Sequence, residues 1–221
     1  MLWSGASLIE LIQLGIILII SIAIHEFAHA WVSYKLGDPT PKLQKRVTLN
    51  PLAHIDPLGL VMVFLIGFGR GKPVEINPGY YKNQRIGEFK VAMAGPLSNL
   101  LLATIGIIIL LFISKFSGMG INTIFSHAYT IPLAQFLGQF AYLNIILMVF
   151  NLLPIPPLDG FTLVKLVNID IAEKILKYQK YIFIGFLIFV FSPLSGNFLS
   201  TIAKVIFNVL TTILASVIYL I

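Results

Sequence analysis

The stretch SIAIHEFAHAWVSYKLG, residues 21–37, continues an apolar run that begins near residue 8 and carries two histidines and a glutamate into it. A helix that crosses a membrane needs about 20 mostly apolar residues, so residues 8–34 are long enough to span one. Ionisable side chains in lipid are costly, which makes His25, Glu26 and His29 candidates for a function.

The composition of the chain supports a membrane protein. Of its 221 residues, 57% are hydrophobic and only 11% are charged, and the mean hydropathy is +0.92. Soluble domains have about 25% charged residues, so this surplus of apolar surface requires lipid around it. The N-terminus MLWSGASLIE has neither a basic segment nor a small-residue cleavage site, and we expect the first apolar run to be kept as a span.

Five stretches are long and apolar enough to be spans, namely residues 8–34, 89–113, 132–153, 178–194 and 198–220. The sequence therefore predicts an all-α polytopic membrane protein with about five to six transmembrane helices in a single integral-membrane domain, residues 1–221. Between the third and fourth spans, the three prolines of LLPIPPLDG forbid a continuous helix. We expect an unwound segment there, followed by a short helix from about residue 159.

The positive charges indicate how the chain is oriented. Most lysines and arginines fall in two segments, one between the first and second spans and one between the third and fourth. By the positive-inside rule both segments face the cytoplasm and the N-terminus lies outside. The net charge of +6 thus reflects membrane topology, and we expect no nucleic acid as a partner.

The segment between the first and second spans contains two short alternating runs, RVTLNP (46–51) and KPVEINP (72–78). Period-two alternation that ends in a turn dipeptide predicts a pair of strands. The apolar stretch 57–69 between them is too short to span, so we expect it to enter the membrane from one side or to pack on the helices. A small β-hairpin with a re-entrant insertion is therefore predicted here.

The histidines and the glutamate have the spacing of a metal site. On a helix, residues four apart project from the same side, so His25 and His29 can bind one zinc ion together. Glu26 is one residue from His25, close enough for its carboxylate to reach a water molecule at the metal. This H-E-x-x-H arrangement is typical of zinc peptidases, in which the glutamate accepts a proton from water.

A catalytic zinc site has three protein ligands and one open position, so a third residue must complete it. The candidates are His54, Asp56, His127, Asp159 and Asp170. His127 falls in the predicted outer loop, and Asp170 lies in a basic, solvated segment. Asp159 follows the proline-rich unwinding, which lets its carboxylate reach another helix, and the pair His54 and Asp56 is the alternative. Another role open to Asp159 is to cap the helix that it precedes.

Four motifs, HEFAHAWVSYKLGDPTP (25–41), TLNPLAHIDPLG (48–59), AMAGPLSNLLLA (92–103) and FNLLPIPPLDG (150–160), together resemble the site-2 protease family of intramembrane zinc metalloproteases. The likeness is greatest to its compact prokaryotic branch without PDZ domains. It covers about residues 20–165 and implies a three-span catalytic core, which we expect over about 8–168. The two C-terminal helices expected over about 178–220 carry no motif that matches the family. The resemblance also implies one Zn²⁺ per chain on His25, His29 and Asp159, with Glu26 as general base.

The resemblance suggests two further site residues and shows one departure. Asn151 matches an asparagine that the family places near the zinc, and we expect it or His54 to stabilise the oxyanion or to position the substrate. Alternative roles are to satisfy backbone freed by the prolines, for Asn151, and to stiffen its loop, for His54. Lys45 stands where the family pattern has a glycine before Arg46, which affects local turn detail.

The resemblance implies a peptidase of the cell membrane that cuts transmembrane segments of membrane-anchored proteins, with its active site towards the cytoplasmic side. A metal transporter is one alternative, because intramembrane histidines also line ion paths. A relative that binds substrates without cutting them is another. A transporter does not need the base Glu26, and the complete set of His25, Glu26, His29 and Asp159 argues against an inactive relative.

Overall fold

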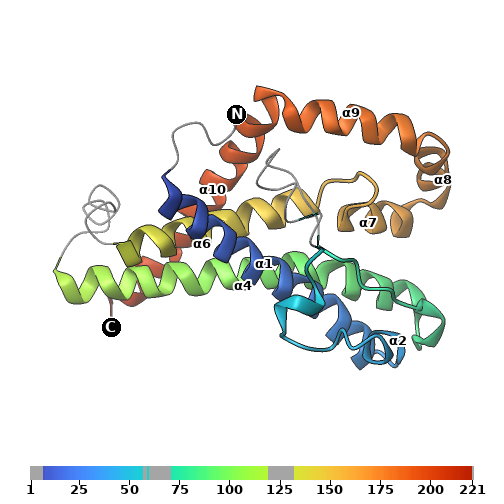
Figure 1. The fold of residues 1–221 in the computed structure, drawn as a ribbon, viewed down its shortest axis with the longest axis horizontal. Helices are drawn as coiled ribbons and strands as arrows, with labels where there is room; N and C mark the ends of the chain where they lie inside the picture. Colours follow the sequence, from blue (N-terminus) through green and yellow to red (C-terminus); the bar gives the residue numbers. More distant parts are fainter. Residues whose placement is uncertain (1–6, 57–58, 60–70, 119–131, 221) are drawn as a thin grey trace. The chain divides into compact units, whose positions relative to one another are not determined.

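The computed structural model describes residues 7–56, 59, 71–118 and 132–220, and the predicted re-entrant stretch lies almost wholly outside these ranges. Their helices are α1 (Leu8–Lys35), α2 (Thr40–Leu43), α4 (Gln84–Ser117), α6 (Pro132–Asn151), α7 (Asp159–Val167), α8 (Ile169–Lys177), α9 (Gln179–Phe191) and α10 (Pro193–Ile218). Two short 3₁₀ turns, η1 (Pro51–Ala53) and η2 (Pro78–Tyr80), lie in the loop after α2. The predicted all-α architecture is confirmed (Figure 1).

Among the described residues, four helices are long and apolar enough to cross a membrane: α1, α4, α6 and residues Leu194–Ile218 of α10. The prediction of a polytopic membrane protein is therefore confirmed. Helix α9, in the fourth predicted span, has only 13 residues. At a rise of 1.5 Å per residue such a helix is about 20 Å long, less than the roughly 30 Å of a hydrocarbon core.

The predicted unwinding before Asp159 is present. Helix α6 ends at Asn151 and α7 begins at Asp159, with turns and bends between them. The prolines of this segment have no N–H to donate to a helix, which explains why α6 does not continue.

The predicted β-hairpin is wrong for the described residues of this loop. They contain one isolated antiparallel bridge, between Ile55 and Gly71, and no strand. Backbone donors that a ladder would use have other partners, since the N–H of Asn77 donates to the carboxylate of Asp38 at 2.7 Å. Each alternating run also ends in a proline, which cannot donate to a ladder. Alternation alone therefore misled the prediction.

The chain divides into two compact units, Met1–Ser98 with Leu152–Lys177 and Asn99–Asn151 with Tyr178–Ile221. In the first unit, α1 contacts α2 and η1, and α7 contacts α8 (Figure 1). In the second, α6 and α9 each contact α10.

The second unit has an apolar core between α4, α6 and α10. Its buried members are Ala103, Ile107, Leu111, Ala141, Ile145, Ala203 and Ile218. The alanines let the helix backbones approach closely, as small residues do in membrane proteins. Beside this core, the amide of Asn99 donates to the side-chain oxygen of Asn144 at 2.9 Å, and both residues are fully buried.

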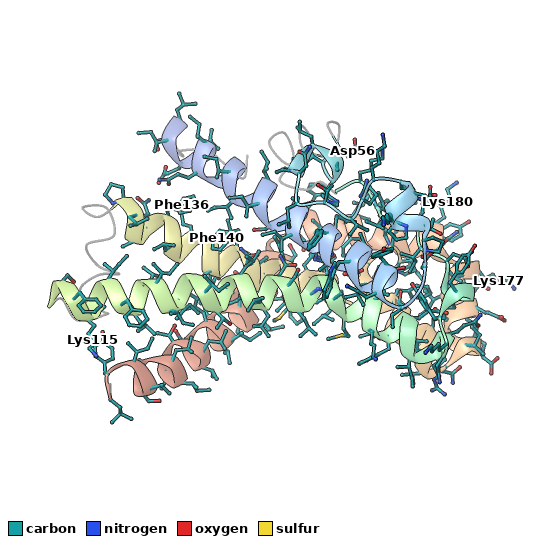
Figure 2. The ribbon with its side chains drawn as sticks, turned by 90° about the horizontal axis from the view of Figure 1, so that it is seen from below. Asp56, Lys115, Phe136, Phe140, Lys177 and Lys180 are labelled. Carbon is teal, nitrogen blue, oxygen red and sulfur yellow. The ribbon has the colours of Figure 1, made fainter. Side chains whose placement is uncertain are left out.

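Further side-chain contacts lie towards one end of this unit. Lys115, near the C-terminal end of α4, donates to the backbone carbonyl of Ile218 at 3.0 Å (Figure 2). A carbonyl in the last turn of a helix has no partner within the helix, so this bond satisfies the end of α10. Phe136 and Phe140 stack one turn apart on α6, with ring centroids 6.2 Å apart (Figure 2).

Candidate metal centre

Two histidines on consecutive turns of α1 begin the site. His25 and His29 are each 8% exposed. The Nδ1 atom of His29 lies 2.7 Å from the backbone oxygen of Val91 on α4. Because a carbonyl can only accept, this nitrogen carries the hydrogen, and Nε2 of the neutral ring keeps its lone pair. Helix α4 thus holds the ring of His29 with the ligating nitrogen towards His25.

Asp159 completes a group of three side chains able to hold a metal ion. Its Oδ2 atom lies 3.2 Å from Nε2 of His25 and 3.3 Å from Nε2 of His29. The two Nε2 atoms are themselves 3.0 Å apart. Three potential ligand atoms from two distant parts of the sequence therefore meet at one point.

The geometry and chemistry of this group fit zinc. Ligand atoms at about 2.0–2.1 Å from a tetrahedral zinc ion lie about 3.3 Å from one another, close to the separations found here. Oδ2 of Asp159 is buried and, in the part of the chain that the structure describes, has no hydrogen-bond partner. A cation would satisfy this oxygen. Two imidazole nitrogens and one carboxylate oxygen are also a usual ligand set of catalytic zinc.

Gly95 on α4 leaves space beside the ligand atoms. A Cβ atom built on this glycine would lie 2.4 Å from Nε2 of His29 and 2.5 Å from Nε2 of His25. Such separations are far below van der Waals contact, so any side chain here would displace the two rings. Because glycine has no side chain, the Nε2 atoms of both histidines stay accessible to an ion.

The start of α7 determines where the carboxylate of Asp159 lies. Leu158, in extended conformation, occupies the N-cap position, and no side chain caps this helix. Asp159 therefore does not serve as the cap that the sequence left as an alternative. Gly160 packs directly on the irregular segment before it, because a Cβ there would lie 2.2 Å from the carbonyl oxygen of Leu152.

Glu26 lies beside the cluster and is paired with an arginine. Its Oε2 atom is 3.9 Å from a guanidinium nitrogen of Arg46, and the two side chains are 15% and 4% exposed. The same guanidinium nitrogen donates to the backbone carbonyl of Lys72. Sequence reasoning did not single out Arg46. Its signal in the sequence was its place at the start of RVTLNP, two residues before the TLNP motif.

The other candidates for a third ligand are not part of the cluster, which contains only His25, His29 and Asp159 among the described residues. His54 and Asp56 lie in the loop after η1, and Asp170 is exposed in the first turn of α8. His127 lies outside the described residues. The structure thus places Asp159, the preferred candidate, with the two histidines.

His54 is fully buried within its own loop. Its Nε2–H donates to the carbonyl of Thr48 at 2.7 Å, and its carbonyl accepts from the N–H of Lys72 at 2.8 Å. Burial lowers the pKa of His54, and the positive charge of Arg46 adds to this, although the bond to Thr48 opposes both. These contacts suit the alternative that His54 stiffens the loop, and a role towards the substrate stays a prediction.

Asn151 is the last residue of α6. Its side-chain amide donates to the carbonyl of Leu147, one turn earlier, at 2.9 Å. This bond suits the alternative in which Asn151 satisfies backbone at the end of a broken helix. Its place near the oxyanion also stays a prediction.

Comparison with known proteins agrees with this centre. The sequence profile of Peptidase family M50 matches residues 13–192. "Putative zinc metalloprotease YwhC" of Bacillus subtilis (strain 168) is 41% identical over 184 residues, which cover 83% of this chain and 82% of the relative. No solved structure gives a significant match.

Two more distant relatives have the same kind of name. "Putative zinc metalloprotease Rip2" of Mycolicibacterium smegmatis is 32% identical over 65% of this chain and 52% of its own length. "Zinc metalloprotease MJ0392" of Methanocaldococcus jannaschii is 31% identical over 66% of this chain and 32% of its own length. The family profile covers most of the chain, and two of the three residues of a group suited to zinc lie on α1, a helix long and apolar enough to span a membrane. The chain belongs to peptidase family M50, the site-2 protease family of membrane zinc metalloproteases.

Proposed function

We propose that this protein is an intramembrane endopeptidase that hydrolyses peptide bonds in transmembrane segments of membrane-anchored proteins. The observation that carries the proposal is the group of His25, His29 and Asp159, with Glu26 beside it, at a membrane-spanning helix. A hydrolytic centre at this place acts on substrates that enter from the bilayer.

The four side chains have separate roles in this proposal. His25, His29 and Asp159 hold one zinc ion, which when bound polarises the scissile carbonyl and lowers the pKa of water. Glu26 accepts a proton from the water that attacks the carbonyl carbon. It then gives this proton to the leaving nitrogen as the C–N bond breaks. The products are a new carboxyl end and a new amine end.

The position of the site along α1 supports water access from the cytoplasmic side. His29 lies six residues before Lys35, the last residue of the helix, which is about 9 Å along the axis. The segment that follows α1 is rich in lysine and arginine, which favours a cytoplasmic location and an N-terminus outside. We therefore propose that the ligands lie below the cytoplasmic membrane surface, within reach of water.

A transmembrane helix hides its carbonyls in hydrogen bonds, so a substrate must unwind before it can be cut. Single-span proteins with a helix-breaking residue near the cytoplasmic end of the span meet this condition at the lowest energetic cost. We propose such proteins, held in the lipid bilayer, as the substrate class.

The decisive experiment compares the purified wild-type protein with Glu26→Gln. Elemental analysis is expected to find one zinc per chain in both, since Glu26 is not a ligand in this proposal. Proteomics of membrane fractions is expected to show uncut stubs of single-span proteins with the variant but not with the wild type. Substantial cleavage by zinc-loaded Glu26→Gln would refute the role of the glutamate.

Chelation and reconstitution provide a second test. A strong zinc chelator is expected to abolish cleavage, and added zinc is expected to restore it. In proteoliposomes the protein is expected to cleave a single-span peptide without zinc entering the lumen. Zinc flux without cleavage would instead support the transporter alternative.

A further inference from the structure

Arg46 is a buried arginine whose guanidinium faces the proposed general base. Its side chain is 4% exposed, and one guanidinium nitrogen lies 3.9 Å from Oε2 of Glu26. Glu26 is the acidic residue with which Arg46 forms an ion pair in the part of the chain that the structure describes. A buried arginine is rare unless its charge is paired, so this contact calls for a role.

Arg46 is held both at its backbone and at its guanidinium group. The backbone N–H of Arg46 donates to the carbonyl of Pro41 in α2 at 2.8 Å. Its guanidinium donates to the carbonyl of Lys72, which anchors the head group to the far end of the loop. The residue before it, Lys45, has a φ of 58°, so the backbone turns directly before Arg46. The guanidinium is therefore fixed before any substrate binds.

The distance between the two groups suits orientation without blocking the carboxylate. At 3.9 Å the pair attracts electrostatically but is longer than a hydrogen bond, which for N–H to oxygen is about 2.7–3.2 Å. The lone pairs of Oε2 consequently remain available to a water molecule. A planar guanidinium with several donors can attract a carboxylate and bind a carbonyl at once, which an ammonium group does less well.

We propose that Arg46 is a positioning residue for Glu26, which it holds in the orientation that lets the carboxylate accept a proton from water. This inference rests on the proposed function, because it takes Glu26 as the general base. In this proposal Arg46 acts on the chemistry through the glutamate.

The test uses the full chain in detergent micelles, with Arg46→Gln and Arg46→Lys beside the wild type. Arg85→Gln is the matched control, since Arg85 is an exposed arginine at the start of α4. The probe is a synthetic single-span peptide with an Asn-Pro break in its apolar stretch and a fluorophore and quencher at its ends. The measurements are kcat, KM, zinc content and the midpoint of thermal unfolding.

Arg46→Gln is expected to lower kcat about 10–100-fold, as loss of residues that orient catalytic groups typically does, with KM and zinc content unchanged. Arg46→Lys is expected to recover part of this loss, and Arg85→Gln to behave as the wild type. A wild-type kcat for folded Arg46→Gln overturns the inference. If that variant does not fold, Arg46→Met, which keeps an unbranched side chain but removes the charge, takes its place, and a wild-type kcat for it overturns the inference in the same way.

A stability measurement separates positioning from a purely structural role. In the wild-type background, Arg46→Gln leaves the carboxylate of Glu26 buried without its partner. Glu26→Gln removes this carboxylate, so Arg46→Gln is expected to lower the unfolding midpoint less in that background. An equal shift in both backgrounds means that the arginine serves only the carbonyl of Lys72, and the inference fails. Full activity of Glu26→Gln is a different result, since it removes the proposed function itself.

Discussion

Gly95 of α4 lies so close to His29 of α1 that an added Cβ would be 2.4 Å from the ligating Nε2. The helix that holds the ring of His29 through the carbonyl of Val91 therefore also leaves the open space beside that ring. One face of α4 both orients the ligand and provides room for the ion.

Gly95→Ala is expected to abolish stoichiometric zinc binding, because the new methyl group must push the ligating nitrogens of His25 and His29 apart. Elemental analysis of the purified variant measures this directly, and activity is expected to fall with the zinc content. Gly185→Ala on α9 is the matched control, since a Cβ there meets no atom within 4 Å. Full zinc occupancy in Gly95→Ala would show that the space beside the rings is not needed.

Gly160→Ala tests how Asp159 is placed. A Cβ at Gly160 would lie 2.2 Å from the carbonyl oxygen of Leu152, so the start of α7 must move away from the preceding segment. Since Asp159 is the adjacent residue, its carboxylate is expected to leave the histidines and zinc affinity to drop at least tenfold. Competition with a chelator of known affinity measures the drop. An unchanged affinity would mean that α7 can shift without moving the ligand.

The sequence was sufficient to single out the three candidate ligands that the structure brings together, but not the residues that shape their surroundings. His25 and His29 were found because helical spacing puts residues four apart on one side, and Asp159 because prolines free the chain before it. The importance of Gly95 and Arg46 depends on contacts with α1 that no local pattern encodes. The predicted strands failed because alternation does not show where backbone donors find their partners, as Asn77 does at Asp38.

Lys45 adopts the left-handed backbone conformation, with a φ of 58°. This conformation costs a residue with a Cβ about 1 kcal/mol or more. Lys45→Gly is therefore expected to stabilise the protein by about 1 kcal/mol, which raises the unfolding midpoint by roughly 2–4 °C. Lys45→Ala removes the same side chain but keeps the Cβ, so it is expected to give no such gain. Equal midpoints for the two variants would contradict the argument from strain.

Asp38 forms the centre of a buried hydrogen-bond network after α1. Its carboxylate accepts from the hydroxyl of Ser33 at 2.8 Å, the N–H of Thr40 at 2.9 Å and the N–H of Asn77 at 2.7 Å. Burial alone would raise the pKa of Asp38, but these hydrogen bonds outweigh it and hold the pKa below its ordinary value. The network extends to Tyr81, whose hydroxyl lies 2.8 Å from that of Ser33.

The lowered pKa of Asp38 fixes the sign of its effect on stability. The unfolded chain binds the proton more tightly, so the stabilisation is complete above the unfolded pKa of about 3.9 and is lost as the pH falls through the folded pKa. Asp38→Asn is expected to cost roughly 2 kcal/mol at pH 7, since hydrogen bonds to a charged group contribute about 1.5–3 kcal/mol. The midpoint should then fall by roughly 4–8 °C at pH 7. This deficit relative to wild type should shrink below about pH 4.

Thermal unfolding in detergent micelles from pH 7 to pH 3 measures the difference between the wild type and Asp38→Asn. Asp170→Asn on α8 removes an exposed carboxylate and is expected to leave the midpoint nearly unchanged throughout, because exposed charges contribute little. Other titrating groups act on both proteins alike, so the difference between the two curves isolates Asp38. A deficit that stayed constant down to pH 3 would show that the charge of Asp38 does not stabilise this network.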